Sequence, residues 1–214
     1  DNGQADTCGT LSYALLKASQ QPTGADPFLI GFSTPVITLT TPLGVISNNN
    51  EVKINLNGGC QVSEGRGVPG VKIVKGVGAG ATALTLGSNV TVNGFGITGF
   101  DGWAIEAQGS GNQINCNWIG TADGLTAGSD GGGIHLMGNN NILGLAGDVA
   151  SGNLIGGNNQ AGLLIEGASS GNQAYNNWFG LKSNGTGSLQ NLVGNLVINT
   201  GGQLKLRQGN RLQR

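Results

Sequence analysis

The chain has 214 residues, of which 42 are glycine and only 10% are charged, and its formal net charge is -1. A near-neutral chain offers no basic field for phosphates, which argues against nucleic-acid binding, and five prolines without a period of three exclude collagen. No apolar run approaches the ~18 residues that a membrane-spanning helix needs, so we expect no membrane span. The abundance of glycine favours an elongated repeat over a compact globule.

Residues 1–27 are predicted to form an N-terminal cap. Within them, residues 10–19 break the strand pattern of the rest of the chain, because one helical face of this segment is apolar. That face carries Leu11, Ala14, Leu15 and Ala18. A solenoid must cover the open end of its first coil, so we expect a short amphipathic helix in this position.

Residues 28–83 contain strand-like apolar runs, and we expect them to form first, irregular coils. A clear repeat then occupies residues 84–204, in which one apolar phrase recurs at spacings of 29, 29 and 33 residues, counted at Ile105, Ile134, Leu163 and Leu196. Repeats of this period are typical of solenoids, and strands this short are stable only when stacked coils pair in parallel. The sequence therefore predicts an all-β fold, a parallel β-helix with three short strands per coil.

Each coil must turn three tight corners, where glycine and asparagine readily adopt left-handed backbone conformations. Asparagine recurs at matching corners, at Asn112, Asn153 and Asn172. We expect these amides to stack as a ladder that satisfies buried backbone groups of the neighbouring coil.

Residues 205–214 form a basic C-terminal end. Four of the ten cationic residues lie here, at Lys205, Arg207, Arg211 and Arg214. Charge on a terminal coil prevents strand pairing with another chain. Two other interpretations stay open, namely further coils beyond this segment and an acidic partner.

The cysteines lie far apart, at Cys8, Cys60 and Cys116, with no Cys-x-x-Cys pair and no histidine cluster. A zinc site is therefore not expected. Cys8 precedes the helix and Cys60 lies in a glycine-rich turn, which makes these two the candidate pair for a disulfide, although connectivity cannot be read from sequence. We expect Cys116 to be a small buried apolar residue.

The stretch Thr7-Cys-Gly-Thr-Leu-Ser-Tyr-Ala-Leu15 resembles a degenerate form of the Cys-Ser-Leu-Arg-Glu-Ala-Ile capping motif of bacterial surface and secreted β-helix proteins. The units Gly-Asn-x-Ile-x-x-Asn-x-Ile-Gly-Thr resemble the right-handed parallel β-helix repeats of the same proteins, within the pectin-lyase-like superfamily. The Arg-Glu pair of the motif is absent here. The resemblance implies a right-handed β-helix that is secreted or exposed on a bacterial cell surface. It implies an activity only loosely, because the superfamily includes polysaccharide lyases, glycoside hydrolases, epimerases and adhesins.

Few titratable residues of the repeat are placed for catalysis. A glycosidase needs two carboxylates on one face, yet the chain has no Asp-Asp pair. Glu106 and His135 occupy the same position of successive repeats, so we expect them to be neighbours about 5 Å apart that could act as an acid-base pair. The alternative is a weak pair on a solvated strand face. Together with Asp130, these residues are the weak catalytic candidates.

Two long loops, 120–133 and 180–195, are predicted to leave the same corner two coils apart. Loops on a rigid scaffold often bind ligands, and the binding candidates here are Asp123, Asp130 and Lys182. The two carboxylates could hold calcium, although no Asp-x-Asp spacing supports such a site. No other metal or cofactor is expected.

Trp118 and Trp178 occupy identical positions of the repeat. If the two indoles are exposed they form a sugar-stacking strip, and if covered they pack beneath adjacent loops. The sequence thus favours an extracellular or cell-surface structural or adhesive module that contacts a polysaccharide or a surface protein. Two alternatives stay open. One is a polysaccharide-acting lyase, hydrolase or epimerase, and the other is a filament subunit that self-associates through its terminal coils.

Overall fold

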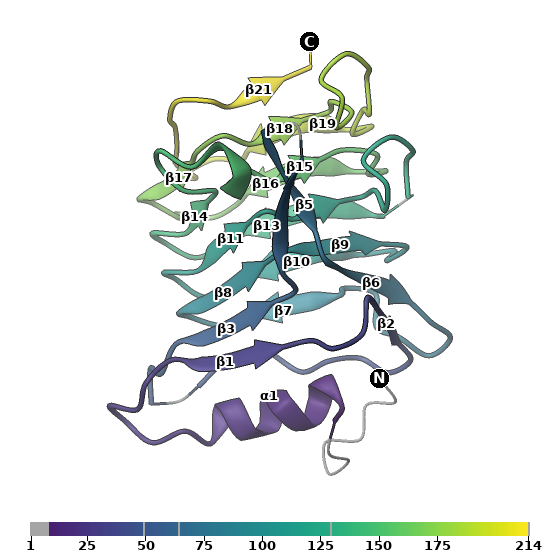
Figure 1. Ribbon diagram of the computed structural model, residues 1–214. Coiled ribbons are helices and arrows are strands. Elements are labelled where there is room, and N and C mark those ends of the chain that lie inside the picture. Colours follow the sequence, from purple (N-terminus) through teal and green to yellow (C-terminus); the bar gives the residue numbers. More distant parts are fainter. Residues whose placement is uncertain (1–8, 49, 64, 129, 214) are drawn as a thin grey trace.

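The computed structural model describes residues 9–48, 50–63, 65–128 and 130–213. Its chain winds through three sheets, named A, B and C here, and each regular coil contributes one short strand to each sheet (Figure 1). Neighbouring strands within each of these sheets are parallel and come from successive coils. This arrangement confirms the predicted parallel β-helix.

The order of strands in each sheet follows the order of the chain. Sheet A contains β1 (Phe28–Gly31), β3 (Ile54–Asn57), β8 (Val90–Asn93), β11 (Gln113–Asn115), β14 (Ile142–Leu143), β17 (Asn172–Ala174) and β20 (Leu204–Leu206). Sheet B contains β2 (Val36–Leu39), β6 (Val71–Lys75), β9 (Phe95–Thr98), β12 (Trp118–Ile119), β15 (Leu154–Ile155), β18 (Trp178–Phe179) and β21 (Arg211–Leu212). Sheet C contains β7 (Leu84–Leu86), β10 (Trp103–Ala107), β13 (Gly132–Leu136), β16 (Ala161–Ile165) and β19 (Gly194–Ile198).

The core consists of columns of apolar side chains that run along the axis of the solenoid. Ile105 pairs in register with Ile134, and Ile134 pairs with Leu163, so the three predicted neighbours lie in one column of sheet C. All three are fully buried. Equivalent positions stack about 4.8 Å apart, which fixes each column wherever the strands pair.

The helix α1 (Leu11–Ser19) lies across the end of the first coil, as the sequence predicted (Figure 1). It begins at Thr10, whose hydroxyl accepts a hydrogen bond from the backbone N–H of Tyr13. Leu11 and Ala18 are buried against the core, which closes the apolar columns at this end. Among the described residues, none of the helices is both long and apolar enough to cross a membrane.

Asparagines form ladders at different corners, and two of these ladders correct the single ladder predicted from the sequence. The first joins Asn112 to Asn141 and Asn141 to Asn172, each backbone N–H donating to the next Oδ1. The second contains Asn117, Asn153, Asn177 and Asn210, linked in the same way. Asn112 and Asn172 lie at or directly before the start of strands of sheet A, whereas Asn153 lies directly before a strand of sheet B. Asn153 therefore belongs to a different ladder. Each ladder satisfies buried backbone donors that no strand can pair.

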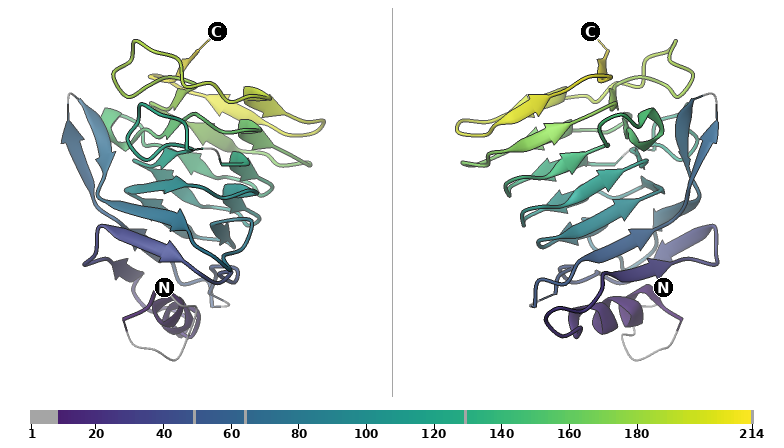
Figure 2. Two further views of the ribbon diagram at one scale, coloured as in Figure 1. Left: turned by 90° about the vertical axis from the view of Figure 1, so that its right-hand side faces the viewer. Right: turned by 60° about the vertical axis from the view of Figure 1, so that its left-hand side comes forward.

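A β-hairpin that the sequence analysis did not predict leaves the solenoid between β3 and β6. It comprises the antiparallel strands β4 (Cys60–Ser63) and β5 (Arg66–Pro69) and stands along the outside of the coils (Figure 2). Both strands contact the 3₁₀ helix η1 (Val149–Ser151), which lies in an insertion between β14 and β15. The hairpin therefore packs against coils that are distant from it in sequence.

A disulfide between Cys60 and Cys116 ties the hairpin to the coils, with Cα atoms 6.1 Å apart. The predicted Cys8–Cys60 pair is therefore wrong, and Cys8 itself lies outside the described residues. The strand register explains the observed pairing of Cys60 with Cys116, because the last residues of β3, β8 and β11 are paired with one another. Residues just beyond β3 and β11 consequently lie at one corner, two coils apart. Cys116 is buried, as expected, but it is not a free thiol.

The last coil leaves the apolar columns uncovered in the part of the chain that the structure describes. Ile198, Leu206 and Leu212 end three of these columns and are 45%, 47% and 42% exposed. The basic segment 205–214 contributes strand residues to this coil, and Arg211 pairs in register with Trp178. The basic end is thus part of the solenoid wall.

We predict that the substitution Asn153→Ala destabilises the fold by about 3 kcal/mol, because it removes buried hydrogen bonds on both sides of one rung. The Oδ1 atom of Asn153 accepts from the backbone N–H and the Nδ2 of Asn117, and its Nδ2 donates to Ile114 and Asn177. Urea denaturation measures the loss. The exposed Gln208→Ala variant serves as the control, and equal midpoints for the two variants would contradict the structural role of the ladder.

We predict that Cys60→Ser lowers the free energy of unfolding by about 4 kcal/mol, the value expected for opening a loop of this length. The bond spans 56 residues of sequence. Thermal unfolding of the oxidised protein measures the effect, with Cys8→Ser as the matched control because it also removes one cysteine. A wild-type melting temperature for Cys60→Ser, or an equal loss for Cys8→Ser, would show that this bond does not stabilise the fold.

Candidate functional site

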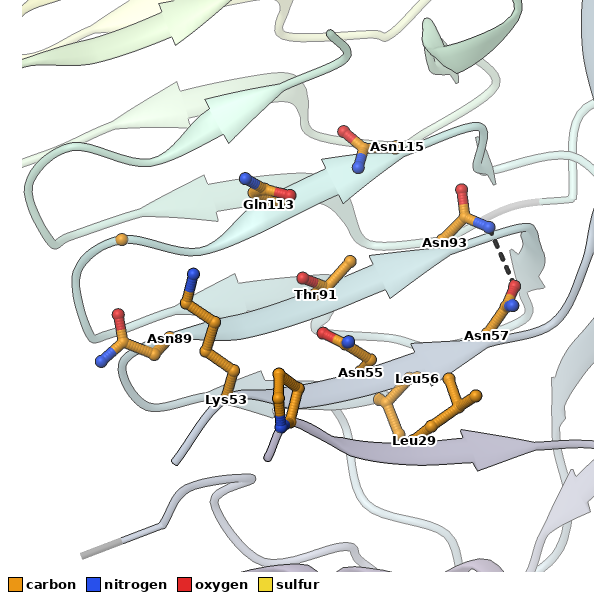
Figure 3. Close-up of a pocket in the computed structure, with 12 residues that line it drawn as sticks. Leu29, Lys53, Asn55, Leu56, Asn57, Asn89, Thr91, Asn93, Gln113 and Asn115 are labelled. Carbon is orange, nitrogen blue, oxygen red and sulfur yellow. Dashed lines mark hydrogen bonds between the residues drawn. The ribbon is translucent and has the colours of Figure 1, made fainter. Parts of the chain in front are cut away.

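A groove of about 420 Å³ crosses the outer face of sheet A and is lined mainly by uncharged polar side chains (Figure 3). Two registered columns form its floor. One contains Asn55, Thr91 and Gln113, and the other contains Asn57, Asn93 and Asn115. Because successive strands stack about 4.8 Å apart, each coil presents the same kind of group at a regular interval along the solenoid axis.

The groove offers many hydrogen-bonding groups and little charge. Amide and hydroxyl side chains both donate and accept hydrogen bonds, which suits them to ligand hydroxyls. Asn93 donates to Asn57 over 2.9 Å, whereas the Oδ1 of the buried Asn115 has no hydrogen-bond partner. Lys53 is the one charged side chain among the lining residues, and Leu29 adds an apolar edge. The groove is therefore a polar surface, and no acid is found among the described residues that line it.

Sequence reasoning missed this groove, although a signal for it was present. Polar residues alternate with apolar ones in β3, β8 and β11, and the polar positions of these three strands are in register. Aromatic and charged residues were the predicted ligand contacts, whereas the amides were predicted to be structural.

A second polar cluster lies on the outer face of sheet C around His135. The Nε2 atom of His135 lies 2.9 Å from Oε2 of Glu166, and Nδ1 lies 3.9 Å from Oε2 of Glu106. The pairing of Glu106 with His135 in register agrees with their predicted proximity. Trp103 packs on the imidazole with ring centroids 4.9 Å apart, and His135 is therefore buried although its strand face points outward.

The His135 cluster has acid-base groups but lies apart from the groove. Glu166, which sequence reasoning missed, follows β16 and reaches the imidazole from the next coil. The other oxygen of Glu106 accepts a hydrogen bond from Gln108 over 2.6 Å. Of the two glutamates, only Glu166 lies within hydrogen-bond distance of the imidazole, so it is the carboxylate that could exchange a proton with His135 directly. None of these residues lines the groove on sheet A.

The two aspartates of loop 120–133 are held by separate groups. Asp123 accepts hydrogen bonds from Leu125, Thr126 and Thr121. Desolvation alone would raise the pKa of Asp123, but these hydrogen bonds outweigh it and lower the pKa to about 2. Asp130 is fully buried, and its Oδ1 accepts from the N–H of Phe100 over 2.7 Å. Among the described residues, no group of three or more His, Cys, Asp or Glu side chains is placed to hold a metal ion.

The two long loops touch one another, as their predicted common corner requires. The backbone N–H of Ser183 in loop 180–195 donates to the carbonyl of Gly124 in loop 120–133 over 2.8 Å. Lys182 precedes this contact and is partly buried, with its backbone N–H bonded to the carbonyl of Gly187.

The hairpin covers both tryptophans that were candidates for a sugar-stacking strip. Trp118 donates its Nε1–H to the carbonyl of Gly67 over 3.1 Å. Trp178 lies under the guanidinium of Arg66, with 3.8 Å from Cζ to the ring centroid. Leu154 pairs in register between the two tryptophans on the outer face of sheet B and is fully buried. The indoles therefore pack beneath a neighbouring segment. That segment is the hairpin, in addition to the long loops that the sequence predicted.

The guanidinium of Arg66 is buried without hydrogen bonds. Its Nε, Nη1 and Nη2 atoms have no partner, and the side chain of Arg211 lies 4.8 Å from the same Trp178 ring. Burial and then the charge of Arg211 lower the pKa of Arg66 to about 10. A cation-π contact contributes about 0.5–2 kcal/mol, while an unpaired buried charge costs several kcal/mol. The contact with Trp178 does not offset that cost.

We predict that Asp130→Asn removes a pH dependence of stability. Burial raises the pKa of Asp130 to about 7, against hydrogen bonds from the backbone of Phe100, Gly99 and Gly120. From about pH 4 to pH 7 the unfolded chain loses this proton while the folded chain keeps it, so the free energy of unfolding falls as pH rises through this window and is level above it.

The variant is expected to be more stable than wild type at pH 8 by on the order of 4 kcal/mol. Asparagine suits the site because Asn158 and Asn191 occupy this corner in the next coils and are hydrogen-bonded to one another. Urea midpoints from pH 4 to pH 8 measure the effect, with the exposed Asp26→Asn as the control. A wild-type slope in Asp130→Asn would disprove the assignment.

No family model matches the chain, and no curated protein matches it in sequence. Among solved structures, the chain is similar to the crystal structure of alginate lyase from Paenibacillus sp. str. FPU-7, with a TM-score of 0.44 and 17% sequence identity. The alignment covers 86% of this chain and 71% of that chain. The parallel β-helix is established here by the strand registers of the chain itself.

Proposed function

We propose that this chain is a glycan-binding β-helix module whose ligand lies along the groove of sheet A. The observation that carries the proposal is the pair of registered amide columns. Hydroxyl-rich ligands are held by many hydrogen bonds, and each coil supplies donors and acceptors at the same two positions, such as Thr91 and Asn93 in β8. A groove of this kind recognises a chain of repeating polar units.

The columns also set the direction of the ligand. They run along the solenoid axis with one coil about every 4.8 Å, which is close to the length of one sugar ring in an extended chain. A linear polysaccharide parallel to the axis would therefore place one sugar over each coil. The rigid stacking supports this fit, because preorganised side chains lose little entropy on binding.

Charge favours an acidic glycan over a basic one. Lys53 is the one ion among the lining residues, and no carboxylate lines the groove. A uronic acid or sulfated sugar near Lys53 would gain an ion pair, whereas a cationic sugar would find no partner. An adhesive role fits a ligand of this class.

Location outside the cytosol is part of the proposal. The Cys60–Cys116 bond supports it, because disulfides form and persist in oxidising compartments. A secreted or cell-surface module meets polysaccharide in such a compartment.

A polysaccharide-acting enzyme is the second candidate, and the His135 cluster favours it. Glu106 and Glu166 flank the imidazole and could serve as acid and base around it. The groove and the cluster lie on different sheets, so the glycan of the first proposal does not reach these carboxylates. Binding without cleavage is therefore the expected behaviour.

We predict that Gln113→Ala weakens polysaccharide binding at least tenfold, because it removes hydrogen-bonding groups from one of the two columns that form the floor of the groove. Affinity electrophoresis against neutral and uronate-containing polysaccharides measures binding, and the uronate polymers should bind more tightly at low salt. The control is Gln173→Ala, since Gln173 occupies the same column two coils further on and lies outside the groove.

Chromatography of the same mixtures distinguishes the two candidates. Intact polysaccharide after incubation supports the binding module. New reducing or unsaturated ends that disappear in His135→Ala would establish the enzyme instead. If no polysaccharide slows the migration of the wild type or of Gln113→Ala in affinity electrophoresis, the groove does not bind glycans.

A further inference from the structure

We propose that Arg66, Trp178 and Arg211 form a binding site for an oxyanion, the carboxylate or sulfate group of an acidic ligand. The site lies where the hairpin meets the outer face of sheet B, away from the groove of sheet A. It goes beyond the proposed function and stands independently of it.

The buried guanidinium of Arg66 lacks any ion-pair or hydrogen-bond partner among the residues that the structure describes. Its side chain is only 6% exposed, and all three of its guanidinium nitrogens are buried without a hydrogen-bond partner. Native proteins rarely leave a buried charge unpaired, and such a group calls for an explanation. A bound anion supplies both the missing charge and the missing acceptors.

Two arginine side chains, Arg66 and Arg211, lie against the same indole ring of Trp178. The Cζ atoms of Arg66 and Arg211 lie 3.8 Å and 4.8 Å from the centroid of Trp178. In the part of the chain that the structure describes, no carboxylate forms a salt bridge with either guanidinium. Two like charges repel each other, and burial together with this repulsion lowers the pKa of Arg66. An anion that contacts both would reverse that repulsion.

The chemistry of arginine specifies the ligand class. The planar guanidinium donates in a fork that matches the oxygen pair of a carboxylate, sulfate or phosphate, whereas chloride offers a single point of contact. Both guanidinium groups contact the same indole, and the proposed oxyanion lies between them.

The surroundings leave a way in from the side of Arg211. Arg211 is exposed and Trp178 is half-buried, while Arg66 closes the inner side beneath the hairpin. An oxyanion therefore approaches from the exposed side, past Arg211 and the half-buried Trp178.

The test titrates the full chain with sodium sulfate and with sodium glucuronate, at an ionic strength held constant with sodium chloride. Tryptophan fluorescence reports binding at Trp178, and thermal unfolding reports it independently, because a ligand of the folded state raises the melting temperature. Wild type is expected to saturate with at least one oxyanion and not with chloride. Tighter binding of glucuronate would identify an acidic sugar as the source, and tighter binding of sulfate an inorganic or sulfate-ester group.

Arg66→Gln and Arg211→Gln should each weaken oxyanion binding at least tenfold. Arg207→Gln is the matched control, because Arg207 is an exposed arginine of the same coil whose Nε donates to Gln173. Circular dichroism checks folding, and the exposed Arg211 provides a variant that does not disturb the buried hairpin contact. Wild-type affinity in both variants, or an identical response to chloride, would overturn the proposal. Gln113→Ala should leave oxyanion binding unchanged, so failure here is distinct from failure of the groove.

Discussion

The constraint on which this structure depends is that every coil must satisfy its corner backbone through the coil beside it. Short strands leave donors at each corner without a strand partner, and buried asparagines accept from them, as Asn153 does from Asn117. An unsatisfied donor at such a place costs about 1–3 kcal/mol, and the ladder repeats in successive coils. These hydrogen bonds therefore fix the register of the coils, and the fixed register determines the relative positions of all outer side chains.

Because register is fixed, each outer face of the solenoid carries an array of side chains and not an isolated group. Sheet A repeats amides, from Asn55 to Thr91 to Gln113. Sheet C places Glu106 beside His135 and brings in Glu166 from the next coil. Sheet B repeats large apolar and aromatic residues that the hairpin covers. The same backbone thus supports three different surfaces, and the array on sheet A lines a groove.

The sequence predicted the features that recur with the repeat period. It missed the features that lie outside the repeat. A spacing of 29 residues was enough to place Ile105 beneath Ile134 and Glu106 beside His135, since equal steps around the coil return to the same position. The ladders were misassigned because Asn112 and Asn153 occupy different corners, a distinction that composition does not carry. The hairpin and its bond to Cys116 lie outside the repeat, so no period could locate them. The amide groove was visible as alternation, but amides at corners and on strand faces look alike in a sequence.

The hairpin decides which face of the solenoid is covered. Trp118, Leu154 and Trp178 point outward from sheet B and would form an exposed apolar strip without it, the kind of patch that soluble proteins reserve for contacts. The hairpin takes the place of such a partner within the same chain, held by the disulfide at its base and by Arg66 near its tip. A clamp made of aliphatic residues would have covered the strip without burying a charge. The presence of an unpaired arginine at that place therefore points to a role beyond packing, while the covering of sheet B leaves the groove of sheet A open for the proposed glycan.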